Sequence, residues 1–261
     1  MKRYRAILTG ASGGIGRAIA AALGPQCDTL LLVGRDAHRL EESAAAAGAS
    51  ARCVVADLAT PQGRAAVTLP GADLLINNAG VGDFAWLGTQ DEAAVERIVV
   101  ANLLAPMLLT RQLLPELARR RESAIVNVGS IFGYVGYPGH SAYCATKFAL
   151  RGFSEALRRE LADGPVRVLY LAPRATRTAL NGAGVRALNA ALGIAMDEPQ
   201  VVARELLALL RRPAPERLLG MPEALFARLN QVLPRVVDRM LRRQLPLIRR
   251  HAPAPLKEGS S

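Results

Sequence analysis

A glycine-rich turn near the start of the chain constrains the fold more than any other stretch. Residues 4–9 have the composition of a short buried strand, residues 10–16 read Gly-Ala-Ser-Gly-Gly-Ile-Gly, and an alanine-rich helix follows over residues 17–23. Glycines at such a junction let the backbone approach a pyrophosphate group, which binds at the N-terminus of the helix. The stretch therefore predicts the first unit of a dinucleotide-binding fold. A tight strand-to-helix turn without a ligand is the alternative interpretation.

The rest of the chain repeats the order of strand and helix. Further short apolar strands are predicted at residues 29–33, 51–56, 73–76, 123–128 and 166–171. Helices are predicted at residues 39–48, 91–117, 143–161 and 199–210, and Pro106 and Pro115 should bend or divide the second of them. This alternation implies parallel crossovers, and 261 residues are enough for one such domain. The expected fold class is α/β, with a single Rossmann-type doubly wound parallel sheet and a C-terminal helical extension.

Three segments are expected along the chain. Residues 1–212 form the Rossmann domain with the active site, and residues 175–196, rich in Ala, Gly and Leu, form its lid over an apolar pocket. A plain pair of surface helices is the alternative for that stretch. Residues 213–252 form a basic amphipathic helical extension, in which a proline opens a new segment at each of Pro222, Pro234 and Pro246. Residues 253–261 are expected to be a disordered tail.

The formal net charge of +11 is partly local, because residues 213–261 carry nine Lys and Arg against four Asp and Glu. Such an excess suits nucleic acid, an anionic membrane or an acidic ligand. Aromatic residues make up 4% of the chain and do not alternate with the basic stretch, so no nucleic-acid partner is expected. Residues 222–250 resemble a basic amphipathic surface helix and are predicted to contact an anionic membrane. Packing of this stretch on its own domain or on a dimer mate is the alternative.

The expected location is the cytoplasm, where the extension would reach the inner face of a membrane. No apolar run approaches the roughly 18 residues needed to span a bilayer. The N-terminus has no signal-peptide core or cleavage site. Cys27, Cys53 and Cys144 show no metal-ligand spacing, and their odd number fits free thiols in a reducing compartment. No metal site is therefore predicted.

The end of the second strand addresses the choice of nucleotide. A carboxylate there usually binds the ribose diol of NAD, whereas an arginine suits the 2′-phosphate of NADP. Gly34 stands where the acid is expected and Arg35 follows, which predicts NADP(H). Asp36 leaves two alternatives open, because a small loop shift could present its carboxylate, or it could form a solvated ion pair with Arg35.

Two further strand ends carry polar or small residues. Asp57, followed by Leu58, could accept a hydrogen bond from the adenine amino group or cap the helix beginning at Pro61, and the two roles do not exclude each other. Residues 77–80, Asn-Asn-Ala-Gly, form a turn that lets the backbone come close to a ligand or to a neighbouring strand.

Tyr143 and Lys147 are the chemical centre of the predicted site. Four residues apart on a helix, they share one face, where the ammonium can lower the pKa of the phenol. Such a pair suits proton transfer to or from an alcohol or carbonyl, although most such pairs are only a solvated surface. Ser130 adds a hydroxyl at the C-terminal end of the fifth strand. Asn102 lies in an apolar helix, where an amide is costly unless it is satisfied.

These motifs together resemble those of the short-chain dehydrogenase/reductase family, over roughly residues 4–210: Gly10-x-x-x-Gly14-x-Gly16, Asn77-Asn78-Ala79-Gly80, Asn102, Ser130, Tyr143 and Lys147. The resemblance implies a Rossmann fold, a nicotinamide cofactor and reversible hydride transfer between a carbonyl and an alcohol. With Arg35 it looks like the NADP-dependent kind. The long helices at 91–117 and 143–161 resemble those through which the family forms dimers and tetramers, so a homo-oligomer is expected.

The resemblance also implies a role for each active-site residue. Tyr143 would donate its proton to the nascent alkoxide during reduction, and Ser130 would hydrogen-bond the substrate oxygen. Lys147, together with the oxidised nicotinamide, would lower the pKa of Tyr143 while it holds the ribose. Asn102 would order a water that relays protons to Lys147. The cofactor-binding set implied in the same way is Gly10, Ser12, Gly14, Ile15, Gly16, Arg35, Asp57, Leu58, Asn78, Ala79, Gly80, Tyr143, Lys147, Pro173 and Thr178.

One position departs from the family pattern, which follows the sixth strand with Pro-Gly and, four residues after that glycine, a threonine. Pro173 and Thr178 fit, but Arg174 replaces the glycine. If the turn there needs a positive φ, an arginine is strained.

Two functions are therefore weighed. The first is an NADPH-dependent carbonyl reductase that acts on an apolar or lipid-like ketone or aldehyde. The alternative is a catalytically weak module that senses NADP(H) or scaffolds a partner.

Overall fold

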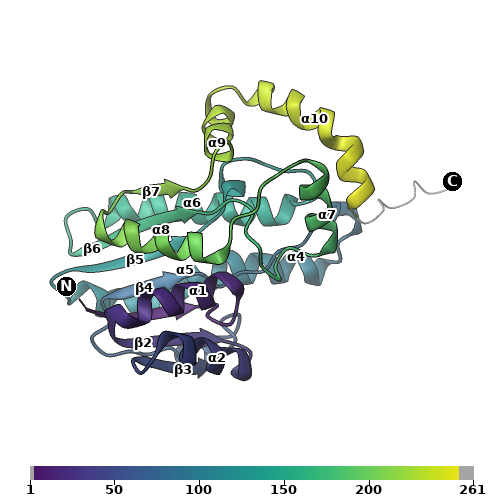
Figure 1. The fold of residues 1–261 in the computed structure, drawn as a ribbon. Helices are drawn as coiled ribbons and strands as arrows, with labels where there is room; N and C mark the ends of the chain where they lie inside the picture. The colour runs from purple at the N-terminus through teal and green to yellow at the C-terminus, as the bar shows by residue number, and fades with distance from the viewer. Residues whose placement is uncertain (1–2, 253–261) are drawn as a thin grey trace.

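Parallel strands form the centre of the molecule. The computed structural model describes residues 3–252, and within that range seven strands make one sheet in the order β3-β2-β1-β4-β5-β6-β7 (Figure 1). They are β1 (Tyr4–Thr9), β2 (Cys27–Gly34), β3 (Ala51–Val55), β4 (Leu74–Asn77), β5 (Ser123–Val128), β6 (Val166–Ala172) and β7 (Glu216–Leu218). All neighbouring strands pair in parallel. The predicted Rossmann-type α/β fold is confirmed, and the strand order reverses between β1 and β4, where sheets of this class bind ligands.

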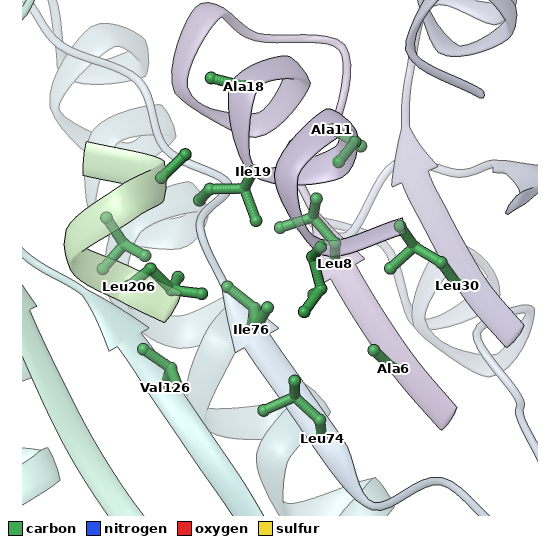
Figure 2. Close-up of a cluster of buried hydrophobic side chains, with 14 of the residues drawn as sticks. Ala6, Leu8, Ala11, Ala18, Ile19, Leu30, Leu74, Ile76, Val126 and Leu206 are labelled. Atoms are coloured by element: carbon green, nitrogen blue, oxygen red, sulfur yellow. The ribbon is translucent and has the colours of Figure 1, made fainter. Parts of the chain in front are cut away.

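Helices cover both faces of the sheet, because successive residues of each strand point to opposite sides. On one face, Leu8 of β1 packs with Ile19 of α1 (Gly14–Leu23) and Leu206 of α8 (Pro199–Arg211), as Figure 2 shows. α2 (Ala37–Ala47) lies on the same face. On the other face, Ile7 of β1 belongs to a second apolar cluster with leucines of α5 (Ala105–Ala118) and α6 (Ser141–Glu160).

The long helical region predicted at residues 91–117 is divided, but its prolines do not end it. α4 (Glu92–Val99) continues through a π-helical segment, η3 (Val100–Leu104), into α5. Pro106 lies in the first turn of α5, and Pro115 lies inside that helix. Asn102 sits in the π-helical segment, a kind of helix distortion that often occurs at functional sites.

The continuous stretch Glu92–Ala118 is long and apolar enough, by composition, to cross a membrane. This differs from the expectation that no apolar run approaches the roughly 18 residues needed to span a bilayer. Its residues Leu109, Leu113 and Leu117 are buried in the second apolar cluster, against Ile125 of β5. This packing is what a core helix of an α/β fold shows, and such helices pass the same length and composition test.

The C-terminal region differs from its prediction in two respects. The sheet extends past residue 212, because β7 pairs with β6, so the boundary drawn there is wrong for the sheet. The extension then forms α9 (Glu223–Val232) and α10 (Pro234–His251), which arch over one end of the molecule (Figure 1). Pro222 and Pro234 stand at helix starts as predicted. Pro246 does not, because α10 continues through it. The predicted disordered tail at 253–261 lies outside the described residues.

Residues 175–196 leave the sheet and return to the same point. They contain α7 (Ala183–Ala191), and a parallel β-bridge between Thr176 and Asp197 closes the base of the segment. Within residues 3–252 only glycines have a positive φ, so the strain considered for Arg174 does not arise. The short elements that complete the fold are η1 (Gly24–Gln26), α3 (Pro61–Ala65), η2 (Leu87–Thr89) and η4 (Ile131–Gly133).

Candidate active site

A buried polar network fixes the strand ends that carry the site. Asn77 at the end of β4 donates from Nδ2 to Asn127 Oδ1 of β5 at 2.8 Å and to Thr110 Oγ1 of α5 at 3.1 Å. Asn127 in turn donates to Ser154 Oγ of α6 at 2.8 Å. The network ties together the elements that hold the predicted catalytic side chains. Sequence analysis missed it, although an asparagine inside an apolar strand was a visible signal.

The glycine turn has no room for side chains. Gly10 has a φ of +65°, and a Cβ on it would lie 2.7 Å from Cα of Ala79. A Cβ on Gly16 would overlap the carbonyl oxygen of Gly10. Gly13 caps α1 without a side-chain hydrogen bond, so the N–H groups of the first turn stay available to an anion. This geometry fits a pyrophosphate group at residues 10–16.

The turn at residues 77–80 is held against the glycine turn. Thr9 Oγ1 accepts hydrogen bonds from the backbone N–H groups of Asn78 and Ala79, both at 3.0 Å. The Asn78 side chain donates from Nδ2 to the carbonyl oxygens of Thr9 at 3.1 Å and Gly10 at 3.2 Å. Asn78 therefore shapes the cofactor site by joining two backbone turns.

The surroundings of Arg35 fit a 2′-phosphate. A Cβ on Gly34 would lie 2.9 Å from Ser12 Oγ, so the Ser12 hydroxyl stands over the end of β2. Arg35 is exposed and enters no ion pair within residues 3–252. The carboxylate of Asp36 accepts from the backbone N–H of Arg39 at 3.0 Å and caps α2. The ion pair between Arg35 and Asp36, considered above, does not form.

Asp57 and Leu58 follow β3, but the predicted cap belongs to another residue. The Asp57 carboxylate accepts from the backbone N–H of Ala59 at 3.0 Å, within its own turn. Thr60 is the residue that caps α3, through a hydrogen bond from the N–H of Gly63 at 3.0 Å. The threonine hydroxyl stands immediately before Pro61 and reaches this N–H, which explains the difference.

Asn102 is buried and fully satisfied by the protein. Its Oδ1 accepts from the N–H of Val81 at 2.8 Å, and its Nδ2 donates to the Val81 carbonyl at 2.8 Å and to Thr146 Oγ1 at 3.2 Å. A Cβ on Gly80 would lie 3.1 Å from Asn102 Oδ1 and 3.8 Å from Lys147 Nζ. Asn102 thus joins α6 to the segment after β4, beside the lysine.

Ser130, Tyr143 and Lys147 meet at the ends of β5 and α6. The Ser130 hydroxyl lies close enough to Tyr143 to lower the pKa of its phenol, and Lys147 Nζ lies 5.6 Å from the centre of the tyrosine ring. Lys147 is buried and donates to the carbonyl oxygen of Val128 at 3.2 Å. Three of the four predicted catalytic side chains therefore meet here, and the fourth, Asn102, lies beside Lys147.

Burial shifts the pKa values of Tyr143 and Lys147 in opposite directions. Burial raises the pKa of Tyr143 to about 12, although the hydrogen bond from Ser130 lowers it in part. Burial also lowers the pKa of Lys147 to about 8. Burial is the largest influence on the phenol's pKa in the protein alone, and a lowering by Lys147 together with an oxidised nicotinamide stays a prediction.

An aromatic cluster that sequence analysis missed surrounds Tyr143. Phe132 contacts the Tyr143 ring edge-on at 6.3 Å and stacks on Tyr137 at 5.2 Å. His140 stacks on Phe84 at 4.9 Å, and its Nδ1 lies 2.8 Å from the carbonyl oxygen of Asp83. Burial lowers the pKa of His140 to about 4, so the imidazole is neutral at physiological pH. Phe132, Tyr137 and His140 lie close to Tyr143 in the sequence and were a visible signal, whereas Phe84 is distant and gave none.

The outer side of this cluster faces the C-terminal extension. Tyr137 OH donates to Gln244 Oε1 of α10 at 3.3 Å, and Asn230 of α9 donates to the carbonyl of Tyr134 at 2.8 Å. A cavity of about 550 Å³ lies between this loop and α10, lined among others by Tyr137, Cys144 and Arg242. The Cys144 thiol is buried and points at the backbone of the same loop, as a packing residue does.

Pro173 and Thr178 connect the sixth strand to the site. The carbonyl oxygen of Pro173 accepts from the N–H of Ile131, next to Ser130, at 3.0 Å. A Cβ on Gly14 would lie 2.8 Å from Cγ2 of Thr178, so the start of the lid rests on the glycine turn. Pro173 therefore lies beside the end of β5 and Thr178 beside the glycine turn, and their contact with a cofactor stays a prediction.

Comparisons with known proteins support the family and the fold of this chain. A family model described as short chain dehydrogenase matches residues 4–188. Nodulation protein G of Rhizobium sp. strain N33 is 36% identical over 175 residues, which cover 65% of this chain and 71% of that protein. A solved short-chain dehydrogenase from Sphingobium yanoikuyae in complex with NADPH is 28% identical with a TM-score of 0.75, over 90% of this chain and 94% of that one. A 3-ketoacyl-(acyl-carrier-protein) reductase from Brucella melitensis, complexed with NADH, is 29% identical with a TM-score of 0.72, over 80% and 91%.

Proposed function

Because this chain belongs to the short-chain dehydrogenase family of oxidoreductases, we propose that it is an NADP(H)-dependent carbonyl reductase for an apolar or lipid-like ketone or aldehyde. The observation that carries the proposal is the meeting of Ser130, Tyr143 and Lys147 beside a glycine turn that fits a pyrophosphate. Bound NADPH would supply the hydride at this site. The protein's own groups would position the carbonyl and supply the proton.

The proton chemistry follows from the local environment. With its pKa raised to about 12, Tyr143 holds its proton at neutral pH and suits the role of general acid in reduction. The Ser130 hydroxyl, which lies beside Tyr143, would donate its proton to the substrate oxygen and align that oxygen with the tyrosine. A carbonyl oxygen that gains negative charge would then receive the phenolic proton. Lys147 would hold the ribose and stabilise charge on this oxygen through Tyr143.

The preference for NADP(H) rests on the second strand end. Arg35 is free to bind a phosphate, while Asp36 is occupied as a helix cap and is not aimed at a ribose. Solved relatives bind NADPH in one case and NADH in another, so the choice depends on this chain's own residues.

The preference for an apolar substrate rests on the aromatic cluster around Tyr143 and on the relative described as a ketoacyl reductase. Phe132 and Phe84 offer ring faces and edges but no charge. A neutral His140 keeps the same wall uncharged.

The test is NADPH oxidation by the purified protein with ketones and aldehydes of increasing chain length. Turnover should rise with chain length, and Tyr143→Phe should lower kcat by about 1,000-fold, the middle of the range for loss of a general acid. Tyr137→Phe is the matched control, because it removes a phenol hydroxyl that bonds Gln244 and not Ser130. Full turnover by Tyr143→Phe would overturn the mechanism. Tight NADPH binding with no turnover across the series would instead favour the sensor or scaffold function.

The same proposal includes a homo-oligomer. Val99, Leu104, Met107 and Phe148 are large apolar side chains exposed on α4, η3, α5 and α6. A second copy that covers these helices would bury them. Sedimentation of the wild type and of a Met107→Glu, Phe148→Glu variant tests this, and an unchanged mass would argue against the interface.

The extension is proposed to dock the cytoplasmic enzyme on an anionic membrane. α10 carries six arginines and one aspartate, and Val232, Leu233, Val236 and Met240 are exposed beside them. Arginine flanking an exposed apolar strip suits anionic lipid headgroups. In flotation with anionic vesicles, the Arg239→Glu, Arg243→Glu variant should no longer float with the vesicles. An Arg52→Glu control, on the far edge of the sheet, should still bind them. Equal flotation of both variants would remove this part of the proposal.

A further inference from the structure

Arg174 is the most densely paired cation outside the proposed catalytic groups. Its Nε and Nη2 donate to the two carboxylate oxygens of Asp197 at 3.0 and 2.7 Å, and its Nη1 donates to Glu223 Oε2 at 3.1 Å. Nη1 also donates to the carbonyl of Met221 at 3.3 Å. The side chains of Arg174 and Asp197 are only 16% and 13% exposed. The planar fork of a guanidinium matches a carboxylate in this two-point geometry, and a lysine does not.

The partners of Arg174 belong to two segments far apart in the chain. Asp197 ends the lid, and its backbone is bonded to the start of the lid through Ala175 at 2.9 Å and Arg177 at 2.8 Å. Glu223 begins α9 of the extension. Arg174 therefore closes the base of the lid and ties it to the extension.

The space for this clamp is provided by a glycine. Gly220 has a φ of +83°, and any Cβ there would overlap the Arg174 side chain. The arginine at position 174 is therefore accommodated because position 220 is a glycine. The guanidinium reaches both acids across the glycine backbone.

The clamp is connected to the nucleotide site through four residues of chain. Thr178 is four residues after Arg174 in the sequence. Its Cγ2 lies against Gly14 of the glycine turn. Asn181 donates from Nδ2 to the carbonyl of Thr176 at 2.6 Å and keeps this part of the lid folded on itself. A displacement of the lid base would move Thr178 away from the start of α1.

We propose that Arg174 is a positioning residue for the nucleotide: by locking Asp197 to the lid base it holds Thr178 against the glycine turn, and it braces that base on the extension through Glu223. The inference rests on the proposed use of NADP(H) at this site. Its expected consequence is a change in nucleotide affinity with little change in the chemical step, because Arg174 touches none of the groups that transfer protons.

The experiment measures NADPH binding by fluorescence titration, together with kcat and KM for NADPH. Arg174→Gly, Arg174→Lys and Asp197→Asn should each weaken NADPH binding, the first by about tenfold, which is the loss expected for one partly buried charged hydrogen-bonded pair. The kcat at saturating NADPH should stay within about twofold. Glu223→Gln keeps the two-point pair with Asp197 and should weaken binding less than Asp197→Asn does.

Arg217→Ala is the matched control, because Arg217 pairs with Glu205 at 3.0 Å between β7 and α8 and contacts no part of the lid. It should bind NADPH as the wild type does. Trypsin cleavage at Arg177 and Arg186 in the lid adds a readout that does not depend on turnover, and NADPH should slow it in the wild type but less in Arg174→Gly.

The outcomes separate this inference from the proposed function. A wild-type protein that binds no NADPH would overturn the proposed function itself. Normal NADPH binding by a folded Arg174→Gly protein, or a loss in Glu223→Gln without one in Asp197→Asn, would overturn the inference. A fall in kcat with unchanged NADPH affinity would also overturn it. Circular dichroism and thermal melting of each variant identify any that fail to fold, and Asp197→Asn then serves in place of Arg174→Gly.

Discussion

The glycine turn at residues 10–16 and the lid at residues 175–196 meet on the same site, but the protein holds them in different ways. The turn is held by close backbone contact, such as that between Gly10 and Ala79, and by the hydrogen bonds of Thr9 and Asn78. The lid is held by ion pairs of Arg174 and by a single β-bridge at its base.

This difference fits the work each region does. A surface for pyrophosphate needs fixed N–H groups at a set distance, and backbone packing provides this with little freedom. If residues 175–196 form the predicted lid, they have to open and close over a substrate, and polar contacts at the base of the segment would allow movement about a defined point. A large side chain is therefore excluded from the turn but tolerated in much of the lid.

The largest effect is expected where the turn is most crowded. Gly16→Ala would place a methyl group over the Gly10 carbonyl and 2.8 Å from Cα of Ala11, so it should destabilise the protein by about 3 kcal/mol and abolish NADPH binding. Gly182→Ala in the lid meets nothing within 4 Å and has an ordinary φ of −59°, so its effect should stay within about 0.5 kcal/mol. Urea unfolding of both variants tests this contrast, and similar losses in the free energy of unfolding would contradict it.

The next effect concerns the buried lysine beside the turn. Burial lowers the pKa of Lys147 from 10.5 to about 8, so below pH 8 the folded protein holds a buried charge at a cost. Between pH 8 and 10.5 the unfolded chain keeps the proton that the folded one has lost, and stability therefore rises with pH. Lys147→Met lacks this pH dependence. The difference by which its free energy of unfolding exceeds that of the wild type should shrink by about 2 kcal/mol between pH 7.5 and 9.5. Parallel stability curves of the two proteins would show that the lysine is not buried as a cation.

A smaller effect is expected at the outer edge of the turn. Arg35→Ala should weaken NADPH binding by about tenfold and leave NADH binding within about twofold, because only NADPH has the 2′-phosphate. Arg52→Ala, an exposed arginine on the adjacent strand β3, is the control for general loss of positive charge. Isothermal titration with both nucleotides distinguishes the two variants, and an equal loss for NADH and NADPH would contradict the assignment.

The smallest effect concerns how far the extension belongs to the core. Val237 is 1% exposed and Val236 is 41% exposed, although they are adjacent on α10. Val237→Ala should cost about 1 kcal/mol or slightly more, since it removes two buried carbon atoms. Val236→Ala should change stability by less than about 0.5 kcal/mol. Equal costs in thermal unfolding would mean that α10 does not pack on the domain with a defined face.

Much of the nucleotide half was predictable because its signals are local. The glycines of residues 10–16 stand between a strand and a helix, and the turn at residues 77–80 follows another strand at a fixed place in the same order. Tyr143 and Lys147 are four residues apart on one helix, so their shared face follows from helix geometry alone. Ser130 is the second residue after the end of β5, so its place at the edge of the sheet also follows from the local sequence.

Other parts of the site depend on long-range contacts that no local pattern predicts. Asn77 and Asn127 pair across fifty residues, and Phe84 and His140 stack across more than fifty. β7 is only three residues long and was missed because too short a run shows no alternation. Asp57 was considered as one possible cap of α3, but Thr60 is the cap, because neighbouring polar residues compete for the same N–H groups.

By itself the sequence determined the doubly wound sheet, the crowded nucleotide turn and the tyrosine–lysine helix, because each follows from the chain's local preferences and the spacing of a few residues. Only the tertiary structure decided the ionisation of Tyr143 and Lys147, since burial depends on which elements cover them. It also decided the role of Arg174, which in the sequence is only a departure from a family glycine. Three-dimensional packing brings Asp197 and Glu223 to one guanidinium and makes that residue a clamp.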